Sequence, residues 1–124
     1  MDFEKDNAFF TGRMKSMKYA AIGAWKLITT EHSIMAQLFF ALVLVAAGFY
    51  YNITRTEWMF QILATGLVLA VEGLNTALEK ICDFVHPGFD TRIGFIKDIS
   101  AGAVMFAAIA AIATGLVIYV PKFL

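Results

Sequence analysis

Three long apolar stretches, separated by short polar breaks, dominate the chain. The first, residues 34–53, carries no charged side chain over roughly 20 positions, which matches the hydrocarbon thickness of a bilayer. A second stretch runs from about residue 57 to 84, and a third from about 98 to 120. The pattern therefore predicts three transmembrane helices.

The N-terminal segment 8–29 follows a different pattern. Its apolar residues recur at helical spacing and form one face: Phe10, Met14, Met17, Ala21, Ala24 and Ile28. Lys15, Lys18 and Lys26 fall together on another face, which is typical of a helix lying along a membrane surface. A soluble helix packed on a core is the alternative. We predict an all-α integral membrane protein, one domain over 1–124, with an N-terminal amphipathic surface helix and three transmembrane helices.

Turn signals predict where these helices begin and end. The polar stretch 29–33 separates the first two, with Thr30 or Ser33 as the expected N-cap. His86-Pro87-Gly88 is expected to stop the second span, and 89–97 to form a loop. Pro121 is expected to end the last helix.

Composition and charge agree with a membrane protein. Hydrophobic residues make up 60% of the chain and charged residues only 16%. The formal net charge is zero, so nothing predicts a nucleic-acid partner. Most basic residues fall on one side of the three-span arrangement, which predicts a cytoplasmic N-terminus; Arg55 and Lys122 lie on the other side.

Polar residues interrupt the apolar pattern in the second half of the middle span. Glu72, Asn75, Thr76, Glu79 and Asp83 lie three, four and seven positions apart, so they share one helix face. An ionisable side chain at membrane depth costs roughly 2.5 kcal/mol or more, and it is a functional hypothesis by default. This stretch is the candidate site.

The polar face has a chemistry that suits phosphoryl transfer. Mg2+ prefers oxygen ligands, often one or two carboxylates together with substrate phosphates and waters, and Glu31 and Glu79 can supply two. Lys97 provides a cation for a phosphate. Glu72 is positioned to accept a proton from a hydroxyl within the membrane, and Asn75 to bridge Glu72 and the metal. Such transfer depends mainly on positioning and charge neutralisation.

Three functions remain open from the residues alone. The glycine-rich nucleotide loops G-x-x-x-x-G-K-[ST] and G-x-G-x-x-G are absent from the sequence. A lipid kinase using MgATP explains the converging carboxylates and lysine. A small proton-coupled transporter would use Glu72 as its carrier site. A structural subunit would use the acidic face only to bind a partner helix.

A resemblance favours the kinase. The motif E-x-x-N-[ST]-A-x-E at 72–79, followed by Lys97-Asp98 and a run of small residues, resembles the small prokaryotic diacylglycerol kinase family. The resemblance extends from about residue 12 to the C-terminus. It implies a three-span lipid kinase of the bacterial inner membrane that uses MgATP, acts on a lipid alcohol and assembles as a homotrimer with sites shared between subunits.

The resemblance also implies roles for individual residues. Glu72 resembles the family's catalytic base, and Asn75 its active-site asparagine. Glu31 and Glu79 resemble the metal ligands that hold the nucleotide phosphates. The remaining nucleotide-binding residues by resemblance are Tyr19, Lys97 and Asp98. Segments 47–58 and 119–122 look closer to undecaprenol kinases than to diacylglycerol kinases, but the lipid stays unresolved between the two.

Overall fold

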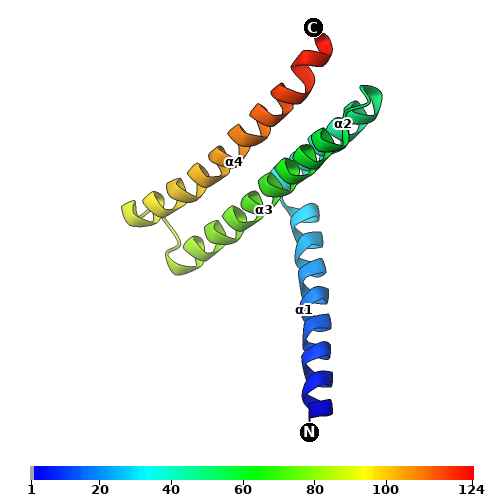
Figure 1. Ribbon diagram of the computed structural model, residues 1–124. Coiled ribbons are helices and arrows are strands. Elements are labelled where there is room, and N and C mark those ends of the chain that lie inside the picture. The colour runs from blue at the N-terminus through cyan, green and yellow to red at the C-terminus, as the bar shows by residue number, and fades with distance from the viewer. Residues whose placement is uncertain (1) are drawn as a thin grey trace. The chain divides into compact units, whose positions relative to one another are not determined.

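The computed structural model describes residues 2–124, with side chains from residue 8 onward. These residues form four helices and no strand: α1 (Asp2–Thr30), α2 (His32–Tyr50), α3 (Arg55–Val85) and α4 (Thr91–Phe123) (Figure 1). The helices α2, α3 and α4 are long and apolar enough to cross a membrane. The predicted all-α fold with one N-terminal helix and three spans is therefore confirmed.

The chain forms two compact units, residues 1–35 and residues 36–124. In the first unit, only Glu31 separates α1 from α2. The backbone N–H of Glu31 donates to the Leu27 carbonyl at 3.1 Å, and that of Met35 donates to the Glu31 carbonyl at 3.1 Å. The expected N-caps were wrong: Ser33 lies inside α2, and the Thr30 hydroxyl donates back to the Lys26 carbonyl at 2.5 Å.

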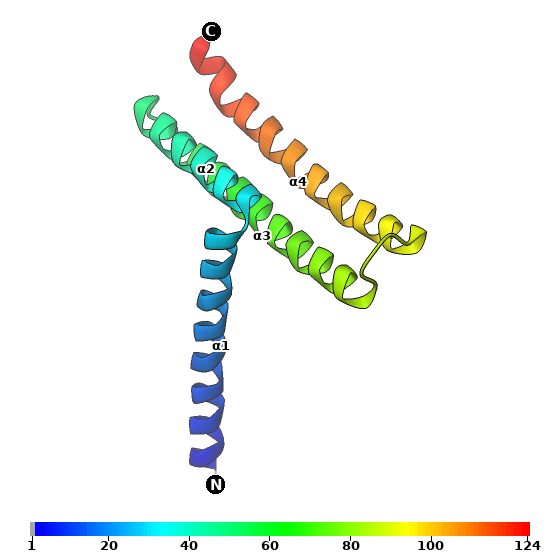
Figure 2. The same cartoon turned by 180° about the vertical axis from the view of Figure 1, so that it is seen from behind.

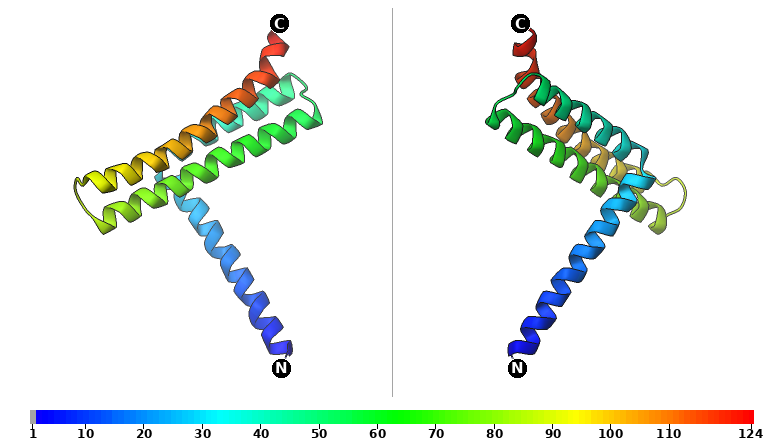
Figure 3. Two further views of the ribbon diagram at one scale, coloured as in Figure 1. Left: turned by 60° about the vertical axis from the view of Figure 1, so that its left-hand side comes forward. Right: turned by 90° about the vertical axis from the view of Figure 1, so that its right-hand side faces the viewer.

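The second unit places α2, α3 and α4 side by side (Figure 3). The closest packing is between α3 and α4, which run antiparallel and are joined by the short loop 86–90 (Figure 2). We call this end of the unit the loop end. The opposite end, where α2 passes into α3, is the aromatic end.

A capping box starts α3 at the aromatic end. Thr54 is the N-cap: its hydroxyl accepts the Glu57 backbone N–H at 3.1 Å, while the Glu57 carboxylate accepts the Thr54 backbone N–H at 2.9 Å. This reciprocal pairing satisfies two of the N–H groups that every helix start leaves without an intrahelical partner. The helix therefore begins at Arg55, two residues before the expected position.

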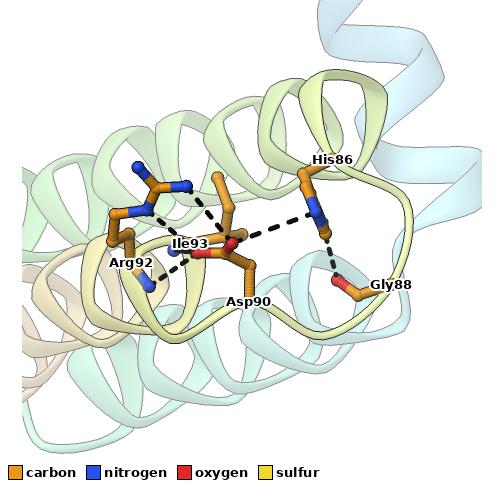
Figure 4. Close-up of polar contacts among 5 residues, drawn as sticks. All are labelled: His86, Gly88, Asp90, Arg92 and Ile93. Carbon is orange, nitrogen blue, oxygen red and sulfur yellow. Dashed lines mark hydrogen bonds and ion pairs between the residues drawn. The ribbon is translucent and has the colours of Figure 1, made fainter.

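The loop end is built around Asp90 (Figure 4). As predicted, α3 stops at the proline-glycine turn, with His86 as C-cap and Gly88 at φ +120°. The Asp90 carboxylate then accepts the backbone N–H groups of Arg92 at 2.8 Å and Ile93 at 3.4 Å. Because this cap starts α4 at Thr91, the expected loop over 89–97 and a helix start near residue 98 were wrong.

Aromatic rings and one ion pair close the aromatic end. Tyr51 lies against the rings of Tyr119 and Phe123, with centroids 6.1 and 5.3 Å apart. Lys122 Nζ lies 3.2 Å from Glu57 Oε1. Pro121 does not end α4, which continues to Phe123. These contacts hold the last turn in place beyond the proline.

A polar cluster crosses the apolar interior of this half of the unit. The Gln61 side chain is 6% exposed and donates to the Leu44 carbonyl at 3.1 Å. The Tyr119 hydroxyl lies 2.5 Å from Gln61 Oε1 and 3.2 Å from the same carbonyl. Buried polar groups of this kind cost free energy unless they are paired, so the cluster ties α2, α3 and α4 together in one register.

Gly48 allows α2 to approach Trp58 of α3 closely. An alanine at this position should therefore destabilise the protein, although alanine in place of glycine normally stabilises a helix. A Cβ at Gly48 would lie 2.6 Å from Trp58 Cη2, and the Trp58 ring is held against Phe49 with centroids 5.0 Å apart. We expect Gly48→Ala to lower the free energy of unfolding by about 1–3 kcal/mol through overpacking. SDS titration of the protein in mixed micelles measures this quantity.

Gly66→Ala is the matched control, since a Cβ at Gly66 meets nothing within 4 Å. Alanine there removes the helix penalty of glycine, so we expect a stability equal to wild type or higher by up to about 1 kcal/mol. Equal losses in the two variants would contradict the close-approach explanation.

The Asp90 cap predicts a loss of stability in acid. Hydrogen bonds from the Arg92 side chain and then from its backbone N–H hold the pKa of Asp90 below its ordinary value. A lowered folded-state pKa contributes stability above the ordinary aspartate pKa, and this contribution is lost as pH falls through the lowered value, below about pH 4. We expect SDS unfolding between pH 7 and 3 to show this loss in wild type. Asp90→Asn retains a capping oxygen and should show a smaller acid loss; an identical pH profile would refute the assignment.

Candidate active site

The polar face of α3 changes from buried to exposed as the helix approaches the loop end. Glu72 is 8% exposed and Thr76 is 6% exposed, both inside the unit. One and two turns further on, Glu79 and Asp83 are exposed. The predicted stripe therefore exists, and it runs from an apolar interior to the surface near the loop end.

Asn75 and Glu79 are brought together on this face. Asn75 Nδ2 donates to Glu79 Oε1 at 3.4 Å, one helical turn away. The other side of the same amide is also bonded: the Ser100 hydroxyl of α4 donates to Asn75 Oδ1 at 2.7 Å. The predicted site asparagine is thus held between a carboxylate of its own helix and a hydroxyl of the neighbouring helix.

Lys97 is held by an acidic partner that the sequence analysis had placed on the stripe without a role. Its Nζ lies 2.6 Å from Asp83 Oδ1, with the two side chains 36% and 66% exposed. A pair this exposed gives up its partner at low cost, because water solvates both ions once they separate. Asp98, the next residue, is exposed.

An apolar groove borders the Asn75–Ser100 hydrogen bond. It has a volume of about 460 Å3 and lies between α3 and α4. Asn75 and Ser100 are its polar lining residues, and the rest are aliphatic: Val71, Leu74, Ala77, Leu78, Ile81 and Ala103. An apolar surface with a few polar groups at one side is the usual character of a site for an amphipathic ligand.

Tyr19 and Glu31 belong to the first unit and are placed within it. Tyr19 lies in the middle of α1 and is 67% exposed. Glu31 is half-buried at the junction between α1 and α2, where its backbone continues the helical hydrogen bonding. The roles that the resemblance implies for these two residues stay predictions.

The donor atoms of the site suit Mg2+ as part of a nucleotide complex. Within residues 8–124 no three His, Cys, Asp and Glu side chains gather as a self-contained metal site. Mg2+ does not require one, because it binds through one or two carboxylates plus substrate phosphates and keeps several waters. The exposed Glu79 carboxylate, steadied by Asn75, fits that requirement.

Sequence reasoning missed two contacts of the site. Ser100 was not singled out, because one serine in an alanine- and glycine-rich span looks like any other small packing residue. Its spacing of three residues from Lys97 places both on one face of α4 and is the signal that could have found it. The Lys97–Asp83 pairing joins two helices, and no local spacing predicts such a contact.

The comparison with known proteins covers the whole site. A model of the family described as prokaryotic diacylglycerol kinase matches residues 18–119, from just before Tyr19 to beyond Ser100. The chain belongs to the prokaryotic diacylglycerol kinase family. The family predicted from the 72–79 motif is therefore confirmed, and with it the class of lipid kinases.

Relatives of this chain include proteins named undecaprenol kinase and proteins named diacylglycerol kinase. An undecaprenol kinase of Bacillus subtilis is 32% identical over 94% of this chain and 91% of its own length. A diacylglycerol kinase of Synechocystis is 30% identical over 88% of this chain and 63% of its own length. A diacylglycerol kinase of Haemophilus influenzae is 28% identical over 78% and 82% of the two chains.

Proposed function

We propose that the chain is an ATP-dependent lipid kinase that transfers the γ-phosphate of MgATP to the hydroxyl of a membrane lipid. One observation supports this most: within a membrane-spanning helix, a buried carboxylate at Glu72 lies two turns from an exposed carboxylate at Glu79. A lipid hydroxyl and a water-soluble nucleotide need these two different environments. Family membership supports the same reaction.

Glu72 is proposed as the general base. Its position within the apolar half of the stripe suits a hydroxyl that reaches the site along the membrane. The carboxylate accepts the hydroxyl proton as the lipid oxygen bonds to the γ-phosphorus, and the bond from phosphorus to the ADP oxygen breaks. Asn75 is proposed to orient the reacting groups beside it.

The nucleotide is proposed to bind at the exposed end of the stripe. Glu79 and, from the first unit, Glu31 are the proposed carboxylate ligands of the Mg2+ that accompanies ATP. That ion would neutralise charge on the phosphates. Lys97 is proposed to exchange its Asp83 partner for a phosphate oxygen, and Asp98 and Tyr19 to contact the nucleotide.

The resemblance to the family and the distribution of basic residues also support proposals for membrane location, orientation and assembly. We place the protein in the bacterial inner membrane with a cytoplasmic N-terminus, as the distribution of basic residues favours. We also propose a homotrimer with sites shared between neighbouring subunits. The lipid is diacylglycerol or undecaprenol, since relatives of both names match over most of the chain.

Phosphate transfer from radiolabelled MgATP tests the proposal directly. Purified protein is offered diacylglycerol and undecaprenol in parallel mixed micelles, and the lipid fractions are counted. Label in one lipid establishes the kinase and identifies its substrate. Label in neither, with helical protein and Mg2+ present, would reject both lipids as substrates and return the proton-coupled transporter to consideration.

Glu72→Gln is expected to remove the base while preserving shape. We expect phosphate transfer to fall by at least about a hundredfold, because proton transfer by a positioned group contributes roughly 10²–10⁴-fold. Glu57→Gln is the matched control, an isosteric change on the same helix at the aromatic end. Full activity in Glu72→Gln, or equal loss in both variants, would contradict the assignment.

Comparing Lys97→Met with Asp83→Asn distinguishes a phosphate-binding role of Lys97 from a role of the Lys97–Asp83 ion pair. We expect transfer to fall on the order of a hundredfold through lost charge stabilisation, with a higher KM for MgATP. Asp83→Asn breaks the same pair from its other side and should retain most activity. Similar losses in the two variants would mean that the pair itself, and not a Lys97–phosphate contact, matters.

A further inference from the structure

The Ser100 hydroxyl makes a different contact from the serine and threonine hydroxyls that bond back along their own helices. Ser16, Thr29 and Thr114 donate back to backbone carbonyls one turn earlier in their own helices, at 2.8–3.0 Å. That bond is the ordinary choice for serine and threonine within a helix. Ser100 instead donates to Asn75 Oδ1 on α3 at 2.7 Å, while half-buried between the helices.

The Glu79 carboxylate determines which of two orientations the Asn75 amide adopts, and the Ser100 hydroxyl donates to the amide in that orientation. An ionised carboxylate only accepts hydrogen bonds, so Glu79 Oε1 requires the NH2 side of the amide to face it. The amide oxygen then faces Ser100, whose hydroxyl donates to it. A flipped amide would set its oxygen against the carboxylate oxygen, which is repulsive. The hydrogen bonds therefore run in one direction, from the Ser100 hydroxyl to the Asn75 amide oxygen and from the Asn75 NH2 group to the Glu79 carboxylate.

We propose that Ser100 is a positioning residue of the kinase site, which acts through Asn75 to hold the Glu79 carboxylate in its orientation. This inference rests on the proposed function, since Glu79 matters as a ligand of the nucleotide's metal. Ser100 lines the groove between α3 and α4 together with Asn75, the residue through which it acts.

Loss of this chain of two hydrogen bonds, from Ser100 through Asn75 to Glu79, should weaken binding of the nucleotide's metal. Without the Ser100 hydroxyl the Asn75 amide is held only by its 3.4 Å bond to Glu79, so its NH2 group spends part of its time away from that carboxylate. The carboxylate then loses a donor that fixes its direction. Mutation of a group that orients a metal ligand typically weakens metal binding or activity. The effect should therefore fall more strongly on MgATP than on the lipid.

The kinetic test compares Ser100→Ala with wild type in the phosphate-transfer assay. We expect KM for MgATP to rise about threefold to tenfold, the size of one net hydrogen bond, with a smaller change in the KM for lipid. Ser100→Thr restores the hydroxyl and should restore the KM. Thr114→Ala deletes a hydroxyl of the same helix that bonds only its own backbone, and it should leave both constants unchanged.

The second test observes the amide itself, without turnover. The chain contains three asparagines, at positions 7, 52 and 75, so protein labelled with 15N only in asparagine gives few side-chain NH2 signals. Asn75→Ala identifies the Asn75 pair by its disappearance. In Ser100→Ala we expect that pair to move toward the signals of the exposed Asn52, and in Ser100→Thr to stay near its wild-type position.

Each outcome decides the matter. An unchanged Asn75 signal and an unchanged KM for MgATP in Ser100→Ala, with wild type active, would overturn the positioning role alone. Equal increases in both KM values, or failure of Ser100→Thr to restore them, would show a general packing defect and also overturn it. A wild-type protein that phosphorylates neither lipid would overturn the proposed function and this inference together.

Discussion

The polar side chains of α3 need partners on other helices, because a hydrocarbon layer supplies none. Such partners are found for Gln61 at a backbone carbonyl of α2, and on α4 for Glu57 at Lys122, Asn75 at Ser100 and Asp83 at Lys97. Lipid tails are as apolar as the helix surfaces, so apolar burial drives helix association weakly inside a membrane. Specific hydrogen bonds and close approach of small residues then set the register. The pairing of α3 with α4 depends on these few contacts.

The two ends of the unit satisfy this requirement in different ways. At the aromatic end the Gln61–Tyr119 cluster is buried, and the capping box and the Glu57–Lys122 pair complete a largely closed set of contacts. Toward the loop end the two pairs that join α3 to α4, Asn75–Ser100 and Asp83–Lys97, are half-exposed or exposed, and each includes a residue of the proposed site. Tightly satisfied contacts suit a fixed scaffold. Exposed pairs can exchange partners when a charged ligand arrives.

The sequence predicted the elements better than their ends. Runs of apolar residues fix the number of spans, and spacing by three and four places Glu72, Asn75 and Glu79 on one face. The starts of α3 and α4 were misplaced because capping by Thr54 and Asp90 is a local side-chain choice that competes with turn signals. Pro121 was misjudged because contacts from Phe123 and Lys122 outweigh its effect. The Ser100–Asn75 bond joins residues 25 positions apart, which periodicity within one helix cannot predict.

The lengths of the helices have a consequence for how the enzyme meets its substrates. α3 has 31 residues and α4 has 33, so at 1.5 Å per residue each is roughly 45–50 Å long. The hydrocarbon core is about 30 Å thick, and both helices extend well beyond it. In the proposed reaction Glu79 and Lys97 act at this boundary, with one reactant dissolved in three dimensions and the other confined to two. For the lipid, the governing concentration is its fraction of the bilayer surface, so dilution by other lipids slows turnover even when the total amount of substrate is unchanged.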